Sequence, residues 1–407
     1  MHCSSHWTGC YPVSPYWTRD VLKCLLAQVL EDEIEFADGM VEEIITALSR
    51  IRWLFVIARN SSFTYKGQVV DVKQVGRELG VRYVLEGSVR KAGGRVRITA
   101  QLIEAESGAH LWADRFDGSV AEIFDLQDNI ASSVAGVIES AVQAAAIRRS
   151  VARPTTDLTA YDLHLRALPD CLSWDDTRVR AALDLLDQAI ERDPQFGPAL
   201  GFAAVCHHHL GRYGSGEGPE SHRRSALDLA HRALQASPDD AGAIANAAFM
   251  LGSLGEDILP AISLVERALE LNPSFARGWG ISAWLRMWGG EPDVAVEHWN
   301  TSIRLSPRHR NVTEHPLFGL AHFFAHRYDE AIAYFLTALA NMPRNPEAHR
   351  YLAASYALTG RMEEARQMID RLQAITPIIL PRIISFRDPE QRELFLSGVC
   401  LAAGEAK

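Results

Sequence analysis

The sequence predicts a small α+β domain near the N-terminus, followed by an all-α superhelical solenoid built from helix pairs. Two observations predict this fold class. Residues 86–102 alternate apolar and polar side chains on both sides of a Gly-Gly dipeptide, which is typical of a β-hairpin with one buried face. From about residue 160 onward, alanine, a bulky residue and proline recur at a nearly constant interval, which is typical of stacked helix pairs.

The composition limits the functional classes before any motif is considered. A chain of 407 residues that is 47% hydrophobic can bury the cores of two or three domains. The net charge of −10 argues against general nucleic-acid binding, because contact with phosphates needs a basic surface. Six irregularly spaced cysteines indicate a reducing compartment rather than a disulfide framework.

The hydropathy pattern predicts neither export nor membrane insertion. No apolar run approaches the roughly 18 residues of a membrane span. The N-terminus also lacks a basic segment followed by an apolar one, so no export signal is predicted. We therefore expect a cytoplasmic protein.

Residues 1–34 are rich in aromatic residues, cysteine and proline, without a helical or strand period, and are predicted to be an irregular leader. Four possible metal ligands occur there, but their spacing matches no common zinc site. They are His2, Cys3, His6 and Cys10. An unstructured leader is therefore favoured over a metal site.

Residues 35–147 are predicted to form the α+β domain, in the order α-β-α-β-β-β-α. Asp38 can cap the first helix, and Gly80 can end the second as a left-handed C′ residue. A linker is expected at 148–158. The predicted elements are a helix at 36–51, a strand at 53–59, a helix at 72–79, the hairpin, a strand at 109–118 and a helix at 120–146.

Three stretches of this domain carry a family resemblance, namely 36–67, 75–118 and 123–135. They resemble the TolB-like N-terminal domain of rhizobial and related bacterial regulators. In that family the domain lies between an N-terminal output domain and C-terminal repeats. The output domain is often a class III adenylate cyclase and sometimes a winged-helix DNA-binding domain. Because 34 residues are too few for either, we expect this chain to lack catalysis.

The helical half has a measurable period. Its pattern ends in prolines that are 44, 35, 34, 36 and 34 residues apart, and this helix-turn-helix period is the signature of tetratricopeptide (TPR) repeats. Proline stops each second helix, because it cannot continue the hydrogen-bond ladder. We expect the array at 159–378, and a capping helix and tail at 379–407. The prolines are Pro194, Pro238, Pro273, Pro307, Pro343 and Pro377.

The search for catalytic motifs finds no phosphate-binding loop and no nucleophile elbow. Three consecutive histidines, 207–209, raise the possibility of a metal site. On a helix, however, they point about 100° apart and cannot all face one ion. We expect His207 in the core and the other two facing the groove. No metal or other cofactor is predicted.

The remaining candidate is a binding surface. The first helix of each TPR repeat lines the concave side, and transfer of the family's groove positions selects several aromatic residues. Aromatic side chains in a groove suit the anchoring of a peptide or partner helix. Alternatively, they pack against neighbouring repeats or the first domain. The candidates are His209, Phe249, Trp284, Met287, Trp288, Leu320, Phe323, Phe324 and Arg350.

The leading hypothesis is a non-catalytic interaction or regulatory scaffold that binds a protein or peptide partner in this groove. Binding would be relayed through the helix at 120–146 and the linker. One alternative is a fragment or mis-started product of a class III adenylate cyclase, acting in cAMP signalling, because the family match starts at Phe36 without the usual preceding strand. A second alternative is a transcriptional regulator that lacks its winged helix. The sequence identifies neither the partner nor the oligomeric state.

Overall fold

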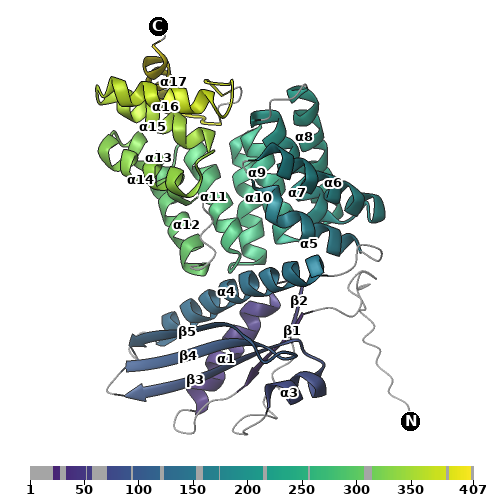
Figure 1. Cartoon of the computed structure of the whole chain (residues 1–407). Coiled ribbons are helices and arrows are strands. Elements are labelled where there is room, and N and C mark those ends of the chain that lie inside the picture. The colour runs from purple at the N-terminus through teal and green to yellow at the C-terminus, as the bar shows by residue number, and fades with distance from the viewer. Residues whose placement is uncertain are drawn as a thin grey trace, which may run out of the picture. The chain divides into compact units, whose positions relative to one another are not determined.

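A computed structural model describes most of the chain as two compact units, Met1–Gln127 and Asp128–Lys407 (Figure 1). The described residues are 22–27, 34–51, 53–56, 71–92, 95–119, 123–152, 159–173, 175–213, 218–254, 257–306, 314–381 and 385–404. The possible metal ligands at positions 2, 3, 6 and 10 lie outside these residues.

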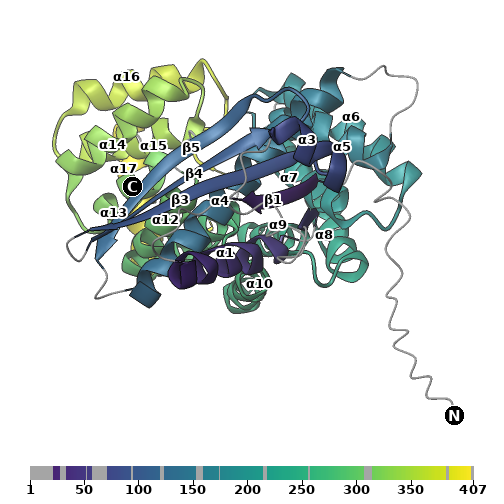
Figure 2. The same cartoon turned by 90° about the horizontal axis from the view of Figure 1, so that it is seen from below.

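The first unit contains a mixed five-stranded sheet with the strand order β2-β1-β3-β4-β5. Strand β1 pairs in parallel with β2 and β3, whereas β3, β4 and β5 are antiparallel. The long strands β3, β4 and β5 lie side by side in Figure 2. The elements are β1 (Leu22–Ala27), α1 (Ile34–Ser49), β2 (Leu54–Val56), α3 (Val72–Leu79), β3 (Tyr83–Ala92), β4 (Arg95–Glu104) and β5 (His110–Ser119).

The predicted hairpin is confirmed as strands β3 and β4. Along β4, Val96, Ile98, Ala100 and Leu102 are buried, while the residues between them are exposed or partly exposed. Gly87 in β3 permits close pairing, because a Cβ there would lie 2.8 Å from the Thr99 carbonyl oxygen. The register therefore keeps the apolar face of the hairpin in the core.

The exposed face of the hairpin carries an ion pair. Arg97 donates a hydrogen bond to Asp117 on β5 at 2.6 Å, and about half of each side chain is exposed to solvent. This face of the strand is therefore solvated. Such pairs contribute little to stability.

Two predicted boundaries are wrong. Residues 22–27 form β1 between β2 and β3, within the segment expected to be an irregular leader. Helix α4 (Ile123–Ala152) continues into the expected linker at 148–158. The end of α4 is tied to the next helix, because Ser150 donates to the Asp162 carbonyl oxygen and Arg166 donates to the Ser150 carbonyl oxygen. These contacts extend helical order past Ala146.

Helix α4 also corrects the expectation about membrane-spanning segments. Its stretch Asp128–Arg148 is long and apolar enough to cross a membrane by length and composition alone, although no such run was expected. In the structure 56% of the apolar window is buried, which is also usual for the core helix of a globular unit. Hydropathy therefore does not decide between these two roles.

The second unit contains, in the described residues, most of α4, then successive helix pairs from α5/α6 to α15/α16, followed by α17. In all six pairs, the alanine that opens the repeating pattern and the residue four positions after it are buried between the helices. The helices are α5 (Ala160–Cys171), α6 (Asp176–Arg192), α7 (Gly197–Tyr213), α8 (Pro219–Ala236), α9 (Ala241–Ser253), α10 (Ile258–Leu271), α11 (Ala276–Trp288), α12 (Pro292–Leu305), α13 (Glu314–Phe324), α14 (Tyr328–Asn341), α15 (Pro346–Leu358), α16 (Met362–Gln373) and α17 (Pro389–Ala403).

The helix ends follow from local sequence. In the first five pairs the proline comes two residues after the last helical residue, as Pro194 follows Arg192. The side chains of Asp240 and Asn345 accept backbone N–H groups at the starts of α9 and α15. Pro377 departs from the rule, because it lies four residues after the end of α16 at Gln373. The connection that follows α16 is therefore different from the earlier ones.

Helix α4 lies across the C-terminal ends of α10 and α12 within the second unit. Gly136 permits this approach, because a Cβ there would be 2.8 Å from the Leu305 carbonyl oxygen. Nearby, Asn272 donates to Glu139 at 3.3 Å, and the hydroxyls of Ser140 and Ser306 are 3.2 Å apart. A small residue on α4 thus lets two helix ends pack directly against its backbone.

Candidate partner-binding surface of the solenoid

The first helices of the repeats, α7, α9, α11, α13 and α15, form the inner side of the solenoid. Arg212 on α7 reaches Glu347 on α15, so these helices face one another although 135 residues separate the two side chains. All nine predicted groove residues lie on these five helices. The position transfer therefore selected residues of these five helices, and their role in binding stays a prediction.

Three of the predicted residues do not line an open groove. Met287, Leu320 and Phe323 are fully buried in the hydrophobic core. The inner faces of neighbouring repeats pack against each other, as shown by the Phe323 ring, which meets Tyr351 of the next repeat edge-on at 5.7 Å. The expectation that these three contact a partner is corrected: they hold adjacent repeats together.

Three other predicted residues form an aromatic row, which we define as Phe249, Trp284 and Trp288. The Phe249 and Trp288 rings stack with centroids 5.3 Å apart, and Trp284 lies 5.9 Å from Trp288. Phe249 and Trp284 remain partly exposed, whereas Trp288 is buried beneath them. This row is an accessible apolar surface on the inner side.

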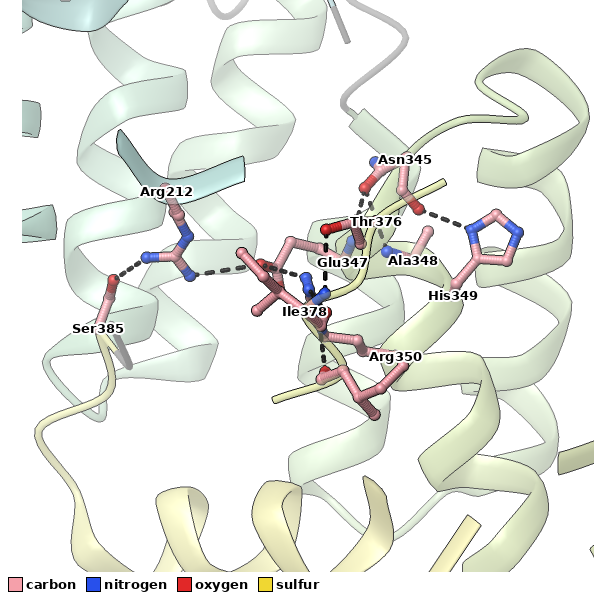
Figure 3. A network of polar contacts seen from close by, with 10 residues as sticks. Arg212, Asn345, Glu347, Ala348, His349, Arg350, Thr376, Ile378 and Ser385 are labelled. Atoms are coloured by element: carbon pink, nitrogen blue, oxygen red, sulfur yellow. Dashed lines mark hydrogen bonds and ion pairs between the residues drawn. The ribbon is translucent and has the colours of Figure 1, made fainter. Parts of the chain in front are cut away.

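A polar cluster with little solvent exposure lies on the same inner side. We call Arg212, Glu347 and Arg350 the polar clasp (Figure 3). The Glu347 carboxylate accepts from Arg350 at 3.1 Å and from Arg212 at 3.4 Å. Arg212 belongs to the last turn of α7 and Glu347 to the first turn of α15. Each charge is therefore at the helix end where the macrodipole favours it.

The arginines decide the ionisation of Glu347. Burial would raise the pKa of this carboxyl group, but Arg350 and Arg212 and the hydrogen bonds from Arg212 and Tyr213 hold it below its usual value. Burial raises the pKa of the Tyr213 and Tyr351 hydroxyls, which stay neutral. The clasp thus holds two positive charges and one negative charge in a desolvated place, and it needs additional acceptors.

The protein supplies these acceptors itself. Residues Thr376–Pro381 and Ser385–Asp388, which we call the C-terminal strap, follow α16 and lie on the inner side. Arg350, only 1% exposed, donates to the carbonyl oxygens of Ile378 at 2.6 Å and Ile379 at 2.8 Å. Arg212 donates to the Ser385 hydroxyl at 3.3 Å (Figure 3). The predicted contact residue Arg350 therefore already has an occupant within the chain.

The second part of the strap satisfies the ends of two inner helices. The backbone N–H of Arg387 donates to the Trp288 carbonyl oxygen at 2.8 Å, at the end of α11. Its guanidinium donates to the Gly252 carbonyl oxygen, and the Ser385 hydroxyl donates to that of Ser253, both at the end of α9. Carbonyls in the last turn of a helix lack intrahelical partners, so the strap provides donors where the helices need them.

Phe386 is the apolar anchor of the strap. Its side chain is 4% exposed and meets the Phe324 ring at 4.8 Å and the Tyr351 ring at 6.4 Å. Arg392 on α17 donates to the Phe386 carbonyl oxygen at 2.9 Å. The predicted groove residue Phe324 is thus partly covered by the protein's own tail. Sequence reasoning missed the strap, and the late Pro377 was the available signal.

The three consecutive histidines on α7 do not converge on one site. His207 shares a 2.8 Å Nδ1–Nδ1 contact with His222 on α8 and is only half-buried, whereas His208 and His209 are buried. The prediction placed His207 in the core and the other two in the groove, whereas the structure buries His208 and His209 and leaves His207 partly exposed. Burial lowers the pKa of His207 to about 4 and that of His208 to about 3. His209 lies 3.6 Å from Asp176.

Comparison with known proteins identifies the repeats. A family model described as tetratricopeptide repeat matches residues 172–217 and 317–377. The chain therefore carries TPR repeats, the class of protein that its periodicity and helix pairs define. Such repeats are typical of protein–protein interaction scaffolds and are generally non-enzymatic.

A sequence relative is the Rhizobium meliloti (strain 1021) protein named "Putative adenylate cyclase 3", 44% identical over 164 residues. The match covers 40% of this chain and 28% of that protein, so the chain spans less than a third of the relative's length.

Two solved structures are also similar. A thermophilic TPR protein of Thermus thermophilus is 21% identical, with 52% of this chain and 98% of that chain covered at a TM-score of 0.36. The human IFIT1 dimer with m7Gppp-AAAA is 17% identical, with 63% and 60% covered at a TM-score of 0.44.

Proposed function

We propose that this chain is a non-catalytic protein-interaction or regulatory scaffold of bacterial signal transduction. Its partner is a protein or peptide that binds the inner side of the solenoid. One observation carries the proposal: the inner side holds an irregular segment of its own chain by hydrogen bonds to its main chain and by one buried aromatic ring. Main-chain hydrogen bonds combined with side-chain pockets are also how recognition domains hold peptides. We place the protein in the cytoplasm, without a nucleic-acid partner or membrane insertion.

The aromatic row and Phe324 supply the apolar part of the proposed surface. Trp284 and Phe324 are partly exposed, so a partner's side chains can reach them without opening the core. Aromatic residues next to buried hydrogen-bonding groups are common energetic centres of protein interfaces.

The test is partner capture by a Trp284→Ala, Phe324→Ala double variant of the full chain. Wild type should retain a partner from an extract of the native cells, and the double variant should lose it while its helical content stays unchanged. Leu259→Ala on α10 is the matched control, because Leu259 is 64% exposed and contributes to neither the aromatic row nor the clasp. Equal capture by all three proteins would contradict the proposal.

For the first unit we propose a TolB-like domain with a coupling role. Its mixed sheet includes β1, so the unit possesses the preceding strand that was expected to be missing. Helix α4 begins in the first unit and continues into the second, where it contacts α10 and α12. We propose that α4 relays partner binding on the solenoid to the first unit.

The second candidate function is the regulatory part of a class III adenylate cyclase in cAMP signalling. The partial identity to the rhizobial relative favours it. The intact mass of the native protein, isolated with an antibody to the solenoid, tests it. A mass near 45.1 kDa supports a stand-alone scaffold. A mass larger by a domain, together with cAMP formation by that species, supports the cyclase.

A further inference from the structure

We propose that the C-terminal strap is an internal occupant of the partner-binding surface, which an external peptide of similar chemistry displaces. The displacing segment is a non-helical peptide that carries an aromatic residue followed by arginine. This inference rests on the proposed function and specifies its partner and its regulation.

The length of the strap is the first argument. Helices α15 and α17 begin at Pro346 and Pro389, although the repeat period is about 34 residues. Four residues, Met342–Asn345, suffice to connect α14 to α15. Helix α17 packs directly against α15, because Gly398 lies against Ala354 and the Phe395 ring lies 4.6 Å from the Tyr351 ring. Connecting α16 to α17 therefore does not require the additional length.

The contacts of the strap are the second argument. Apart from the Phe386 ring and Ile379, which pack against the hydrophobic core, they are mainly hydrogen bonds between strap atoms and groups on the inner helices. Arg212 donates to Ser385 and to Glu347 at 3.3 and 3.4 Å, at the weak end of the range, and its buried Nε has no hydrogen-bond partner among the described residues. Another peptide backbone can supply the same carbonyl acceptors and N–H donors. Exchange of one segment for another therefore leaves few buried polar groups unsatisfied.

The groups that face the strap define the chemistry of the displacing peptide. The carbonyls of Gly252, Ser253 and Trp288 end α9 and α11, where the helix macrodipole is negative. These carbonyls attract the arginine that follows the ring, whereas the Arg212 and Arg350 guanidinium groups attract oxygen acceptors. The slot beside Phe324 and Tyr351 accepts an aromatic ring. Arg350 requires carbonyl oxygens upstream of that ring, as Ile378 and Ile379 provide.

Because the strap is tethered to the surface, it occupies the surface more readily than a free peptide of equal intrinsic affinity. A tethered segment acts at an effective concentration of about a millimolar when its linker fits the site. The apparent affinity for a free peptide falls by the fraction of molecules in which the site is open. Weakening the strap should therefore increase the affinity of an external peptide without adding any contact.

The experiment uses a fluorescein-labelled peptide with the sequence of residues 376–388, titrated into the full chain and followed by fluorescence anisotropy. We expect Phe386→Ala to bind this peptide at least tenfold more tightly than wild type, and Arg387→Ala to shift affinity in the same direction. Leu401→Ala on the exposed face of α17 should behave as wild type. A scrambled peptide of equal composition should bind none of them.

Equal affinity for wild type and both strap variants would overturn the proposal that the strap blocks the surface. Thermal unfolding followed by circular dichroism identifies a variant that does not fold. If Phe386→Ala does not fold, the peptide affinity of Arg387→Ala is compared with that of wild type instead. If folded strap variants bind no peptide but still capture the native partner, this inference fails while the proposed function stands. Loss of both peptide binding and partner capture, including capture by wild type, would remove the proposed function as well.

Discussion

Arg212 and Glu347 form an ion pair with a 3.4 Å N–O distance between two helices that are 135 residues apart in sequence. Arg350 binds the same carboxylate oxygen from within α15. Because little solvent reaches these groups, the pair is not a surface salt bridge of small effect. Its removal leaves two guanidinium groups facing each other without a counter-charge.

Glu347→Ala should therefore destabilise the solenoid by about 3–5 kcal/mol, the usual cost of leaving a buried charge unpaired. Urea unfolding followed by far-UV circular dichroism measures this change in the free energy of unfolding. Glu363→Ala is the control, because Glu363 is exposed in the first turn of α16 and its loss should cost about 0.5 kcal/mol or less. Equal effects of the two substitutions would show that the clasp does not stabilise the fold.

The clasp should also weaken in acid. The pKa of Glu347 is lowered below its ordinary value of 4.5, so its stabilising contribution is present above that pH and is lost as the pH falls through the folded-state pKa. The groups that face it are Arg212, Arg350 and the neutral hydroxyls of Tyr213 and Tyr351.

The measurement is the difference in free energy of unfolding between wild type and Glu347→Ala from pH 7 to pH 3.5. This difference should be constant above about pH 5 and shrink below 4.5. The buried histidines also titrate in acid, but they are common to both proteins and cancel. A difference that stays constant down to pH 3.5 would contradict the claim that ionised Glu347 stabilises the clasp.

Gly136→Ala should destabilise the second unit, although alanine is the better helix former by about 1 kcal/mol. The added Cβ would lie 2.8 Å from the Leu305 carbonyl oxygen and 3.0 Å from that of Ser274, so α4 must move away from both helix ends. We expect a loss of about 1–3 kcal/mol, as for other overpacked sites.

Gly242→Ala on α9 is the matched glycine control. The contact that its Cβ would meet within 4 Å is the Asp240 carboxylate oxygen at 3.3 Å, the end of a short side chain. Thermal unfolding of both variants should give a lower midpoint for the α4 substitution alone. A raised midpoint for Gly136→Ala would show that α4 does not pack closely on α12.

Leu102→Ala should destabilise the hairpin of the first unit by about 2–5 kcal/mol, because the side chain is fully buried and opposes Leu85 in the sheet register. Thr99→Ala on the exposed face of the same strand should have a much smaller effect. Hydrogen exchange of the β3 and β4 amides measures both. Similar protection in the two variants would place the core on the wrong face of the sheet.

The repeat period made the solenoid predictable, because each helix pair needs the same small and bulky residues at the same places. The alternation along β4 made the hairpin predictable for a similar reason: one face is buried and the other is not. Strand β1 was missed, because LKCLLA is a short apolar run without alternation, and such a run is recognised only when its neighbours in the sheet are known.

The candidate surface was predictable only in part. Family positions selected residues of the inner helices, but they assume an open groove. Met287 and Phe323 are buried because adjacent repeats pack tightly, and Arg350 is covered by a segment that follows it by about 28 residues. Contacts of this kind depend on the curvature of the array, which the repeat pattern of one sequence does not specify.

The contact between α7 and α15 changes how the array can come apart. In an ordinary solenoid each repeat touches only its neighbours, so terminal repeats can unfold one at a time while the others persist. Here a repeat near one end is bonded to a repeat near the other, and the strap adds contacts to α9 and α11. The repeats between them should therefore unfold as a single cooperative block. A substitution that weakens the strap or α15 should also lower the stability of α7.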